Sequence, residues 1–430
     1  MKYLNQLLYD MRHQRLMTWV SIIGTALAIF LIMSFIMADS INYIEMSPES
    51  HRNRTMVGTS MHIRAITSRE DSSSTMGLNP DVARQLYDNL DGVEKVSYVS
   101  SWDNTVDIGT PGQETFSGQS KSVDNNFWDL YDFKFIDGRP FNADECKAEI
   151  PGVIITRSVA MKAFGEPEVA GREIEINMSP FTVIGVIEDS SPLLSLTYSQ
   201  VYSIFNIDGD SKNDPWFGNT SVRLLLDKST DTDFIKQQVE GRYKQLESKA
   251  NEAGYNLIYH NQPYNTEDFA AGLQGSNGTP DTRTHKVILA IVYSLLILIP
   301  AINLASMTRA RLRHRVAEIG VRRAFGARRS NIVTQLFAEN LIITIVGGLI
   351  GLALSLLFMM FASQFLFSYG SKFETTLELL TVKPDLAMLF RWSNFFIAMG
   401  ACLIMNILSA TIPAWRASRI APAVALSASK

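Results

Sequence analysis

Arginine side chains are the most concentrated chemical groups in this sequence. Residues Arg309–Gln335 carry eight arginines against one glutamate and lie between two apolar stretches. Positive charge beside apolar spans keeps a loop on the cytoplasmic side of a membrane. Within the loop, Leu312, Val316 and Ile319 recur at i, i+4 and i+7 and would form one apolar stripe on a helix. This stripe favours docking into a partner's groove over a purely topological role.

Residue patterns for catalysis are missing from the sequence. It contains no G-x-x-x-x-G-K-[ST] loop to hold nucleotide phosphates, so ATP hydrolysis by that route is excluded. No H-E-x-x-H or G-x-S-x-G motif occurs, and the histidines show no metal-ligand spacing. The six histidines are His13, His51, His62, His260, His285 and His314. We therefore assign no catalytic, cofactor or metal residue, and an exported enzyme is disfavoured.

Four apolar stretches are long enough to cross a bilayer, since about 20 helical residues span its core. They are residues 17–38, 287–307, 333–366 with the apolar part Leu341–Ala362, and 392–412. The first is too long for the apolar region of a signal peptide, which favours an uncleaved anchor. The sequence thus predicts a membrane protein with four transmembrane α-helices plus a large mixed α/β domain, residues 39–286, inserted between spans 1 and 2.

Charge predicts the orientation of these parts. Asp39–His285 holds 21 Lys plus Arg against 37 Asp plus Glu, so the insert is acidic and the remainder is basic. The basic groups all fall on one face of four spans, which predicts that both termini are cytoplasmic and the insert is periplasmic. Residues 1–16, 308–332 and 413–430 would then be cytoplasmic, and 367–391 a short periplasmic loop. We expect a bacterial inner membrane protein in contact with lipids and not with nucleic acid.

The apolar stretches contain no Asp, Glu, Lys, Arg or His when the third is taken as Leu341–Ala362, and ion-coupled carriers normally need such groups. Asn303 and Asn406 are interpreted as hydrogen-bonding groups between helices rather than a substrate site. Pro300 is expected to kink the second span. Gly347 and Gly351, in a G-x-x-x-G pattern, predict close helix packing, either within the chain or in a dimer.

The insert is predicted to be mixed α/β. Arg172–Met178 and Phe181–Ile187 read as a hairpin with a turn at Ser179-Pro180. Gly152–Ile155 reads as a buried strand, and Asp233–Ala253 as a helix with Phe234, Val239 and Leu246 at apolar positions. The two cysteines, Cys146 and Cys402, fall in different compartments, so no internal disulfide is expected; the role of Cys146 is not indicated.

The run Arg315–Ile332 (RVAEIGVRRAFGARRSNI), with Glu339 and the Gly-rich third span, resembles the coupling region of MacB-like ABC permeases, relatives of the FtsX type. Pro413–Leu426 is similar to the closing motif of that family. In the insert, Gly138–Phe141, Ala163–Gly165 and Phe181–Asp189 resemble its periplasmic core domain. The similarity covers nearly the whole chain in the expected order.

This resemblance implies a permease dimer, of identical or paralogous chains, that sits on two cytosolic ATPase subunits. ATP and Mg would be bound by the ATPase, and its closure would be transmitted through the spans to the periplasmic domains. MacB carries its ATPase in the same polypeptide, whereas this sequence starts at the first span, so we expect a separate ATPase chain. The residues that the resemblance assigns to ATPase coupling are Leu312, Arg315, Val316, Glu318, Ile319, Gly320, Arg322, Arg323, Gly326, Ala327 and Arg328.

Two functions follow from these expectations. The first is export or efflux of a periplasmic substrate, with a periplasmic adaptor as a further candidate partner. The alternative is mechanical signal transmission to a periplasmic hydrolase, or antimicrobial-peptide sensing, without transport. The sequence does not decide between them.

Overall fold

The computed structural model describes residues 15–40, 43, 45–66, 74–191, 194–209, 214–272, 279–298, 302, 329–368 and 390–404. The chain divides into two compact units. One consists of residues 1–41, 286–364 and 385–430, and the other of residues 42–285 and 365–384. We call the first the helical unit and the second the α/β unit.

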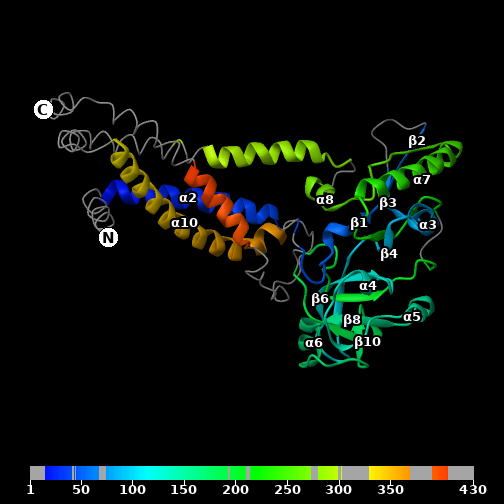
Figure 1. The fold of residues 1–430 in the computed structure, drawn as a ribbon. Helices are drawn as coiled ribbons and strands as arrows, with labels where there is room; N and C mark the ends of the chain where they lie inside the picture. Colours follow the sequence, from blue (N-terminus) through cyan, green and yellow to red (C-terminus); the bar gives the residue numbers. More distant parts are fainter. Residues whose placement is uncertain are drawn as a thin grey trace. The chain divides into compact units, whose positions relative to one another are not determined.

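The helical unit contains two helices that are long and apolar enough to cross a membrane, Thr18–Ser40 and Leu341–Phe361. They belong to α2 (Arg15–Ser40) and α10 (Arg329–Ser368) (Figure 1). A shorter apolar helix covers Trp392–Ile404, and residues 282–298 are also helical. The second and fourth predicted spans extend beyond the described residues, so the described part of the chain shows two of the four predicted spans at full length.

The α/β unit is built on one mixed sheet with the strand order β11-β8-β10-β9-β5-β6-β4-β13-β3-β2-β14. Most neighbours are antiparallel, but β10 pairs with β8, and β11 with β6, in parallel. The hydrophobic core is divided into three clusters along this sheet. We therefore describe the unit as two lobes.

The first lobe surrounds one core cluster, to which α3 and α7 contribute. Its elements are β1 (Thr55–Gly58), β2 (Met61–Ala65), β3 (Ser74–Leu78), α3 (Pro80–Tyr87), β4 (Val93–Ser100), β12 (Phe217–Gly218), β13 (Thr220–Leu226), α7 (Thr232–Glu252) and β14 (Tyr255–Leu257). Asn79 begins α3 by accepting a hydrogen bond from Asp81 N at 2.8 Å, as an N-cap should.

Along α7, Ile235, Val239 and Leu246 are buried, whereas Phe234 is 47% exposed. The predicted helix is confirmed, and its buried stripe begins at Ile235.

The second lobe contains most of the other two clusters, and one of them also includes Val57, Val99 and Leu225 of the first lobe. Its elements are β5 (Asn104–Gly109), β6 (Phe116–Val123), α4 (Phe127–Leu130), β7 (Phe135–Gly138), α5 (Ala143–Ala148), β8 (Gly152–Thr156), α6 (Arg157–Phe164), β9 (Glu173–Ile176), β10 (Ser179–Ile187) and β11 (Val201–Ile204). Every residue of β8 is buried, which confirms the predicted strand. Two further elements complete the unit. The short helix η2 (Arg52–Arg54) lies near the start of its chain, and α8 (Thr266–Gly272) lies near the end.

The predicted hairpin is confirmed, but its turn is displaced. Ser179 pairs with Ile176 and Pro180 with Glu175, so Pro180 lies inside β10. The turn consists of Asn177 and Met178, whose φ angles are +52° and +61°. Two consecutive positive φ values match the right-handed twist of a two-residue hairpin. Pro180 is tolerated because the pairing of β10 with β8 begins only at Thr182.

Candidate functional site

The residues predicted to contact an ATPase lie outside the described residues. This holds for all eleven positions from Leu312 to Arg328 and for Pro300. Of the predicted helix-packing positions, Gly347 and Gly351 are described, and both lie on α10. The coupling role of the eleven residues and the kink at Pro300 therefore remain predictions. The packing role of Gly347 and Gly351 can be compared with the contacts that they make.

Gly347 and Gly351 lie against α2. A Cβ at Gly347 would be 2.9 Å from Thr25 Cβ and 3.0 Å from the Ile22 carbonyl oxygen. A Cβ at Gly351 would overlap the carbonyl oxygen of Ala26. The missing side chains therefore let the backbones of α2 and α10 approach closely, which is how small residues act in membrane helix pairs. This contact is made within one chain.

The chain enters the α/β unit through residues 45–60, the leading segment, and returns through residues 258–268, the return segment. These two segments are joined to each other. Val57 and Tyr264 exchange two backbone hydrogen bonds of 2.9 and 2.8 Å. Gln262 accepts from Thr59 N and donates to the Ser60 carbonyl, both at 2.8 Å. The leading and return segments thus meet in one hydrogen-bonded junction within the α/β unit.

Glu49 fixes the leading segment to the second lobe. Its side chain is fully buried, and Oε1 accepts 3.0 Å hydrogen bonds from Leu196 N, Thr197 N and Thr197 Oγ1. Its Oε2 lies 3.5 Å from Arg52 Nε, also in a buried position. The Arg52 carbonyl in turn accepts from Thr266 Oγ1 at 2.9 Å, on the return segment. Charge-assisted bonds to a buried carboxylate are among the stronger protein hydrogen bonds.

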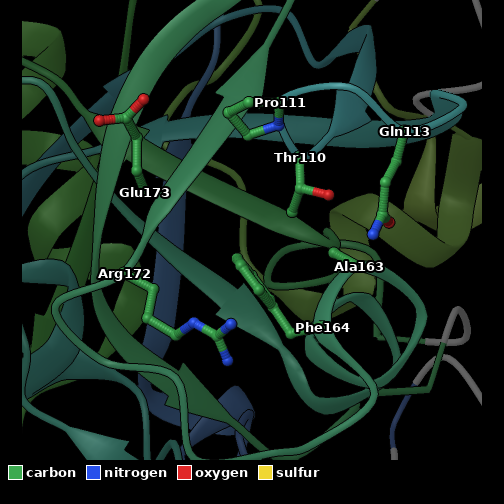
Figure 2. A pocket seen from close by; sticks show the side chains of 7 residues that line it. All are labelled: Thr110, Pro111, Gln113, Ala163, Phe164, Arg172 and Glu173. Atoms are coloured by element: carbon green, nitrogen blue, oxygen red, sulfur yellow. The ribbon is translucent and has the colours of Figure 1, made fainter.

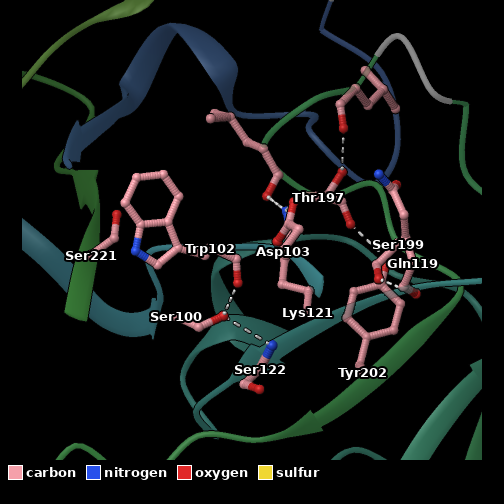
Figure 3. Close-up of polar contacts among 12 residues, drawn as sticks. Ser100, Trp102, Asp103, Gln119, Lys121, Ser122, Thr197, Ser199, Tyr202 and Ser221 are labelled. Carbon is pink, nitrogen blue, oxygen red and sulfur yellow. Dashed lines mark hydrogen bonds and ion pairs between the residues drawn. The ribbon is translucent and has the colours of Figure 1, made fainter. Parts of the chain in front are cut away.

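The same region contains further buried charge (Figure 3). Lys121 on β6 is 3% exposed; its Nζ donates to the Leu196 carbonyl at 3.0 Å and lies 3.4 Å from Asp103 Oδ2. Burial lowers the pKa of Lys121, and Arg223 on β13 lowers it further, while Asp103 and Glu49 raise it. The five side chains Glu49, Arg52, Asp103, Lys121 and Arg223 form what we call the junction cluster. It brings together the leading segment and both lobes.

The return segment is also fixed to α7. Lys236 Nζ lies 2.6 Å from Asp268 Oδ2, with side-chain exposures of 11% and 6%. The same oxygen accepts from Asn265 N at 3.0 Å, at the start of α8. Removal of one partner of such a pair would leave the other charge buried and unpaired. The pair therefore holds α8 in one position on the first lobe.

Other polar sites in the α/β unit offer little chemistry. A surface pocket of about 420 Å³ is lined by Thr110, Pro111, Gln113, Ala163, Phe164, Arg172 and Glu173 (Figure 2). Its guanidinium is already engaged, since Arg172 stacks 4.6 Å from the Phe164 ring centre and pairs with Glu166 at 2.6 Å. Among the described residues, no group of three His, Cys, Asp or Glu side chains could hold a metal ion. Burial raises the pKa of the Cys146 thiol to about 11, so this thiol is unreactive at neutral pH.

Sequence reasoning did not identify the junction cluster. Glu49 follows Ser47-Pro48, a pattern typical of an exposed turn. Its partners Leu196 and Thr197 are almost 150 positions away, so no local spacing connects them. The one available signal was an acidic residue close to an arginine at i+3, which is common on solvated surfaces.

Two sequence families match the chain. Residues 18–241 match the family described as MacB-like periplasmic core domain, and residues 290–422 match the FtsX-like permease C-terminal family. With its long apolar helices and its α/β unit, the chain is a permease of the ABC transporter class. It belongs to the MacB-like family, which confirms the resemblance drawn from the arginine-rich loop and the insert motifs.

Individual relatives are distant. An uncharacterized ABC transporter permease, YknZ of Bacillus subtilis (strain 168), is 24% identical over 289 residues, covering 66% of this chain and 69% of YknZ. The macrolide export ATP-binding/permease protein MacB of Chromobacterium violaceum is 24% identical over 318 residues. That match covers 71% of this chain but 42% of MacB, so the chain spans less than half of that relative. The periplasmic region of MacB from Actinobacillus actinomycetemcomitans is 15% identical, covers 51% of this chain and 94% of that structure, and has a TM-score of 0.35.

Proposed function

We propose that this chain is the membrane subunit of an export system in which a separate cytosolic ATPase binds ATP and Mg and drives movement of the α/β unit. The α/β unit would lie in the periplasm, with both chain termini in the cytoplasm. Residues 308–332 would contact the ATPase through the stripe of Leu312, Val316 and Ile319. A second permease chain would complete the assembly.

The observation that carries this proposal is the junction of the leading and return segments. Movement of a helix changes a distant domain only if the connection between them is stiff. Here the leading and return segments are hydrogen-bonded to each other, and Glu49 and Arg52 fix the leading segment to the second lobe and the return segment. Each hydrogen bond to a charged group contributes about 1.5–3 kcal/mol, several times thermal energy. A displacement delivered to the leading segment would therefore be passed on to the return segment and the second lobe.

Export is favoured as the outcome by the relatives. The C. violaceum MacB protein is named for macrolide export. The two long apolar helices, Thr18–Ser40 and Leu341–Phe361, contain no charged residue apart from Asp39 at the end of the first, and their buried polar side chains are Thr and Ser. This composition favours a protein that moves its exported domain over one that transports ions. The cargo would then be taken up from the periplasm.

The direct test is the change Ile319→Glu, which places a charge in the apolar stripe. The tagged chain is purified from its native membranes, and the ATPase that is retained is identified by mass spectrometry and assayed for ATP hydrolysis. We expect the wild type to retain an ATPase and Ile319→Glu to lose it by at least tenfold. Phe234→Glu, on the exposed surface of α7, is the matched control and should retain the ATPase. Equal retention by Ile319→Glu would refute docking through this loop.

A further inference from the structure

The second predicted span carries an exposed apolar stripe of regular spacing. Within helix 282–298, four aliphatic side chains follow one another at intervals of three, four and three residues. They are Ile288, Ile291, Leu295 and Leu298, with exposures of 52%, 54%, 49% and 47%. We call them the span-2 stripe. In the sequence, Ile302 follows at a further interval of four, so the mean interval is 3.5 residues. This is the repeat of the a and d positions of a left-handed coiled coil.

The opposite side of this helix contacts another helix of the same chain. With Ile288 at position a, Tyr293 is at position f, on the far side from a and d. Its hydroxyl donates to Asp39 Oδ2 at 3.2 Å, and its ring lies 5.1 Å from the Phe35 ring at an interplanar angle of 86°. Asp39 and Phe35 both belong to α2. The helix therefore packs on α2 through its f side, and the span-2 stripe is left on the side away from that contact.

The exposed apolar residues of α2 and α10 are arranged differently. On α2, Ile23, Leu27 and Leu31 are exposed at a constant interval of four, which drifts around the helix by about 40° per step. On α10, exposed residues occur in adjacent pairs such as Leu349 and Ile350, which make a broad face. Fluid lipid chains need no particular spacing and suit such faces. A repeat of 3.5 residues instead keeps a narrow line of side chains against one neighbouring helix.

The partner that fits the span-2 stripe is a second copy of this chain. Two copies inserted in the same direction are related by a two-fold axis along the membrane normal, so their equivalent helices run parallel. In a parallel pair, each a residue meets the same a residue of the other copy, and each d residue meets its equivalent. From Ile288 to Leu298 every a and d residue is aliphatic. The stripe is therefore complementary to itself and has no polar group to select a different partner.

We propose that Ile288, Ile291, Leu295 and Leu298 form a contact between two identical copies of this chain, in which the second spans pair in parallel. This inference deepens the proposed function, because it names the surface through which the second permease chain binds. Lipid chains, a paralogous permease and another segment of the same chain are the competing occupants of the stripe.

Cysteine crosslinking of the full chain in its native membranes tests this contact without an ATPase or cargo. Single cysteines are introduced after Cys146 and Cys402 have been replaced by Ala, and the membranes are oxidised with copper phenanthroline. Because a disulfide needs two Cα atoms within about 7 Å, we expect Ile291→Cys and Leu295→Cys to give about tenfold more disulfide-linked homodimer than Leu289→Cys. Leu289 lies on the same helix at position b, outside the stripe.

Two control positions distinguish a specific contact from collisions in lipid. Ile23 on α2 and Leu349 on α10 are 61% and 55% exposed, more than any residue of the span-2 stripe. Ile23→Cys and Leu349→Cys should therefore stay monomeric. Equal crosslinking at these positions, a maximum at Leu289→Cys, or a product with the mass of a different protein would overturn the proposal. So would the absence of a homodimer at every stripe position, when reduced samples contain as much chain in the membrane as the wild type.

The ATPase that co-purifies with each variant reports separately on the proposed function. Homodimer crosslinking at the span-2 stripe without a retained ATPase would support this contact and contradict the proposed function. A retained ATPase without homodimer crosslinking would contradict the contact alone.

Discussion

At the scale of single residues, Glu49 matters most. One carboxylate oxygen of Glu49 contacts the second lobe, and the other contacts Arg52. The side chains of Glu49 and Arg52 are both buried. A buried ion pair of this kind is not by itself a strong source of stability, because both charges lose their hydration. It does fix one arrangement of the leading segment, which is what a mechanical connection needs.

The change Glu49→Ala should destabilise the α/β unit by about 3–5 kcal/mol, because it removes a buried carboxylate that accepts from Leu196 N and Thr197 N and pairs with Arg52. Denaturant unfolding of the full chain, followed by tryptophan fluorescence, measures this loss. Glu166→Ala breaks the exposed pair with Arg172 and should cost less than about 1 kcal/mol. A similar small cost for both variants would show that the junction is not held by Glu49.

The residues of the junction cluster could not be predicted from the sequence, whereas the buried strand β8 could. A run such as Gly152-Val-Ile-Ile155 indicates burial by composition alone. The burial of Glu49 and Lys121 depends on which distant loops cover them, and these contacts arise only from the tertiary fold. The apolar pattern of short sequence segments therefore predicted strands of the core such as β8. It could not predict the buried polar contacts that Glu49 and Lys121 make with distant loops.

At the scale of elements, the contact of α2 with α10 depends on glycine. Gly351→Ala should destabilise the helical unit by about 1–3 kcal/mol, since the added methyl group meets the Ala26 carbonyl in a packed interface. Gly400→Ala is the matched control, because an added Cβ there has no atom within 4 Å. Thermal unfolding of the detergent-solubilised chain distinguishes the two. A drop in Tm of equal size for both variants would contradict the close packing.

The β9–β10 hairpin gives a second test at this scale. Met178 has a positive φ and is 87% exposed, so its side chain gains little from packing and its backbone is strained. Met178→Gly should stabilise the α/β unit by about 1 kcal/mol, since glycine adopts this conformation without steric cost.

Met161→Gly, on the exposed side of helix α6, is the control of opposite sign. It should destabilise by about 0.5–1 kcal/mol, because glycine weakens a helix. Chemical denaturation of both variants checks the pair, and a loss of stability for Met178→Gly would refute the assigned turn. The sequence predicted this hairpin from strand alternation but placed the turn at Ser179-Pro180, since Asn177-Met178 lacks the glycine that usually indicates such a turn.

At the scale of the whole molecule, charge and hydropathy are divided along the sequence. The α/β unit is formed by the acidic part, whereas the arginine-rich loop falls, in the sequence, between helix 282–298 and α10. This division, the order of the segments and the family could be predicted from the sequence, because each depends on composition or on local motifs. The junction within the α/β unit required the structure.

We propose that the nucleotide state of a partner ATPase changes the arrangement of the two lobes through this junction. Spin labels at Met178→Cys in the second lobe and Phe234→Cys in the first, with Cys146 and Cys402 replaced by Ala, would report the distance between the lobes in the complex with the co-purified ATPase. We predict a different distance distribution with ATP and vanadate than without nucleotide, and no difference when Glu49→Ala is added. Identical distributions in both nucleotide states of the unaltered junction, with ATP hydrolysis intact, would contradict the account.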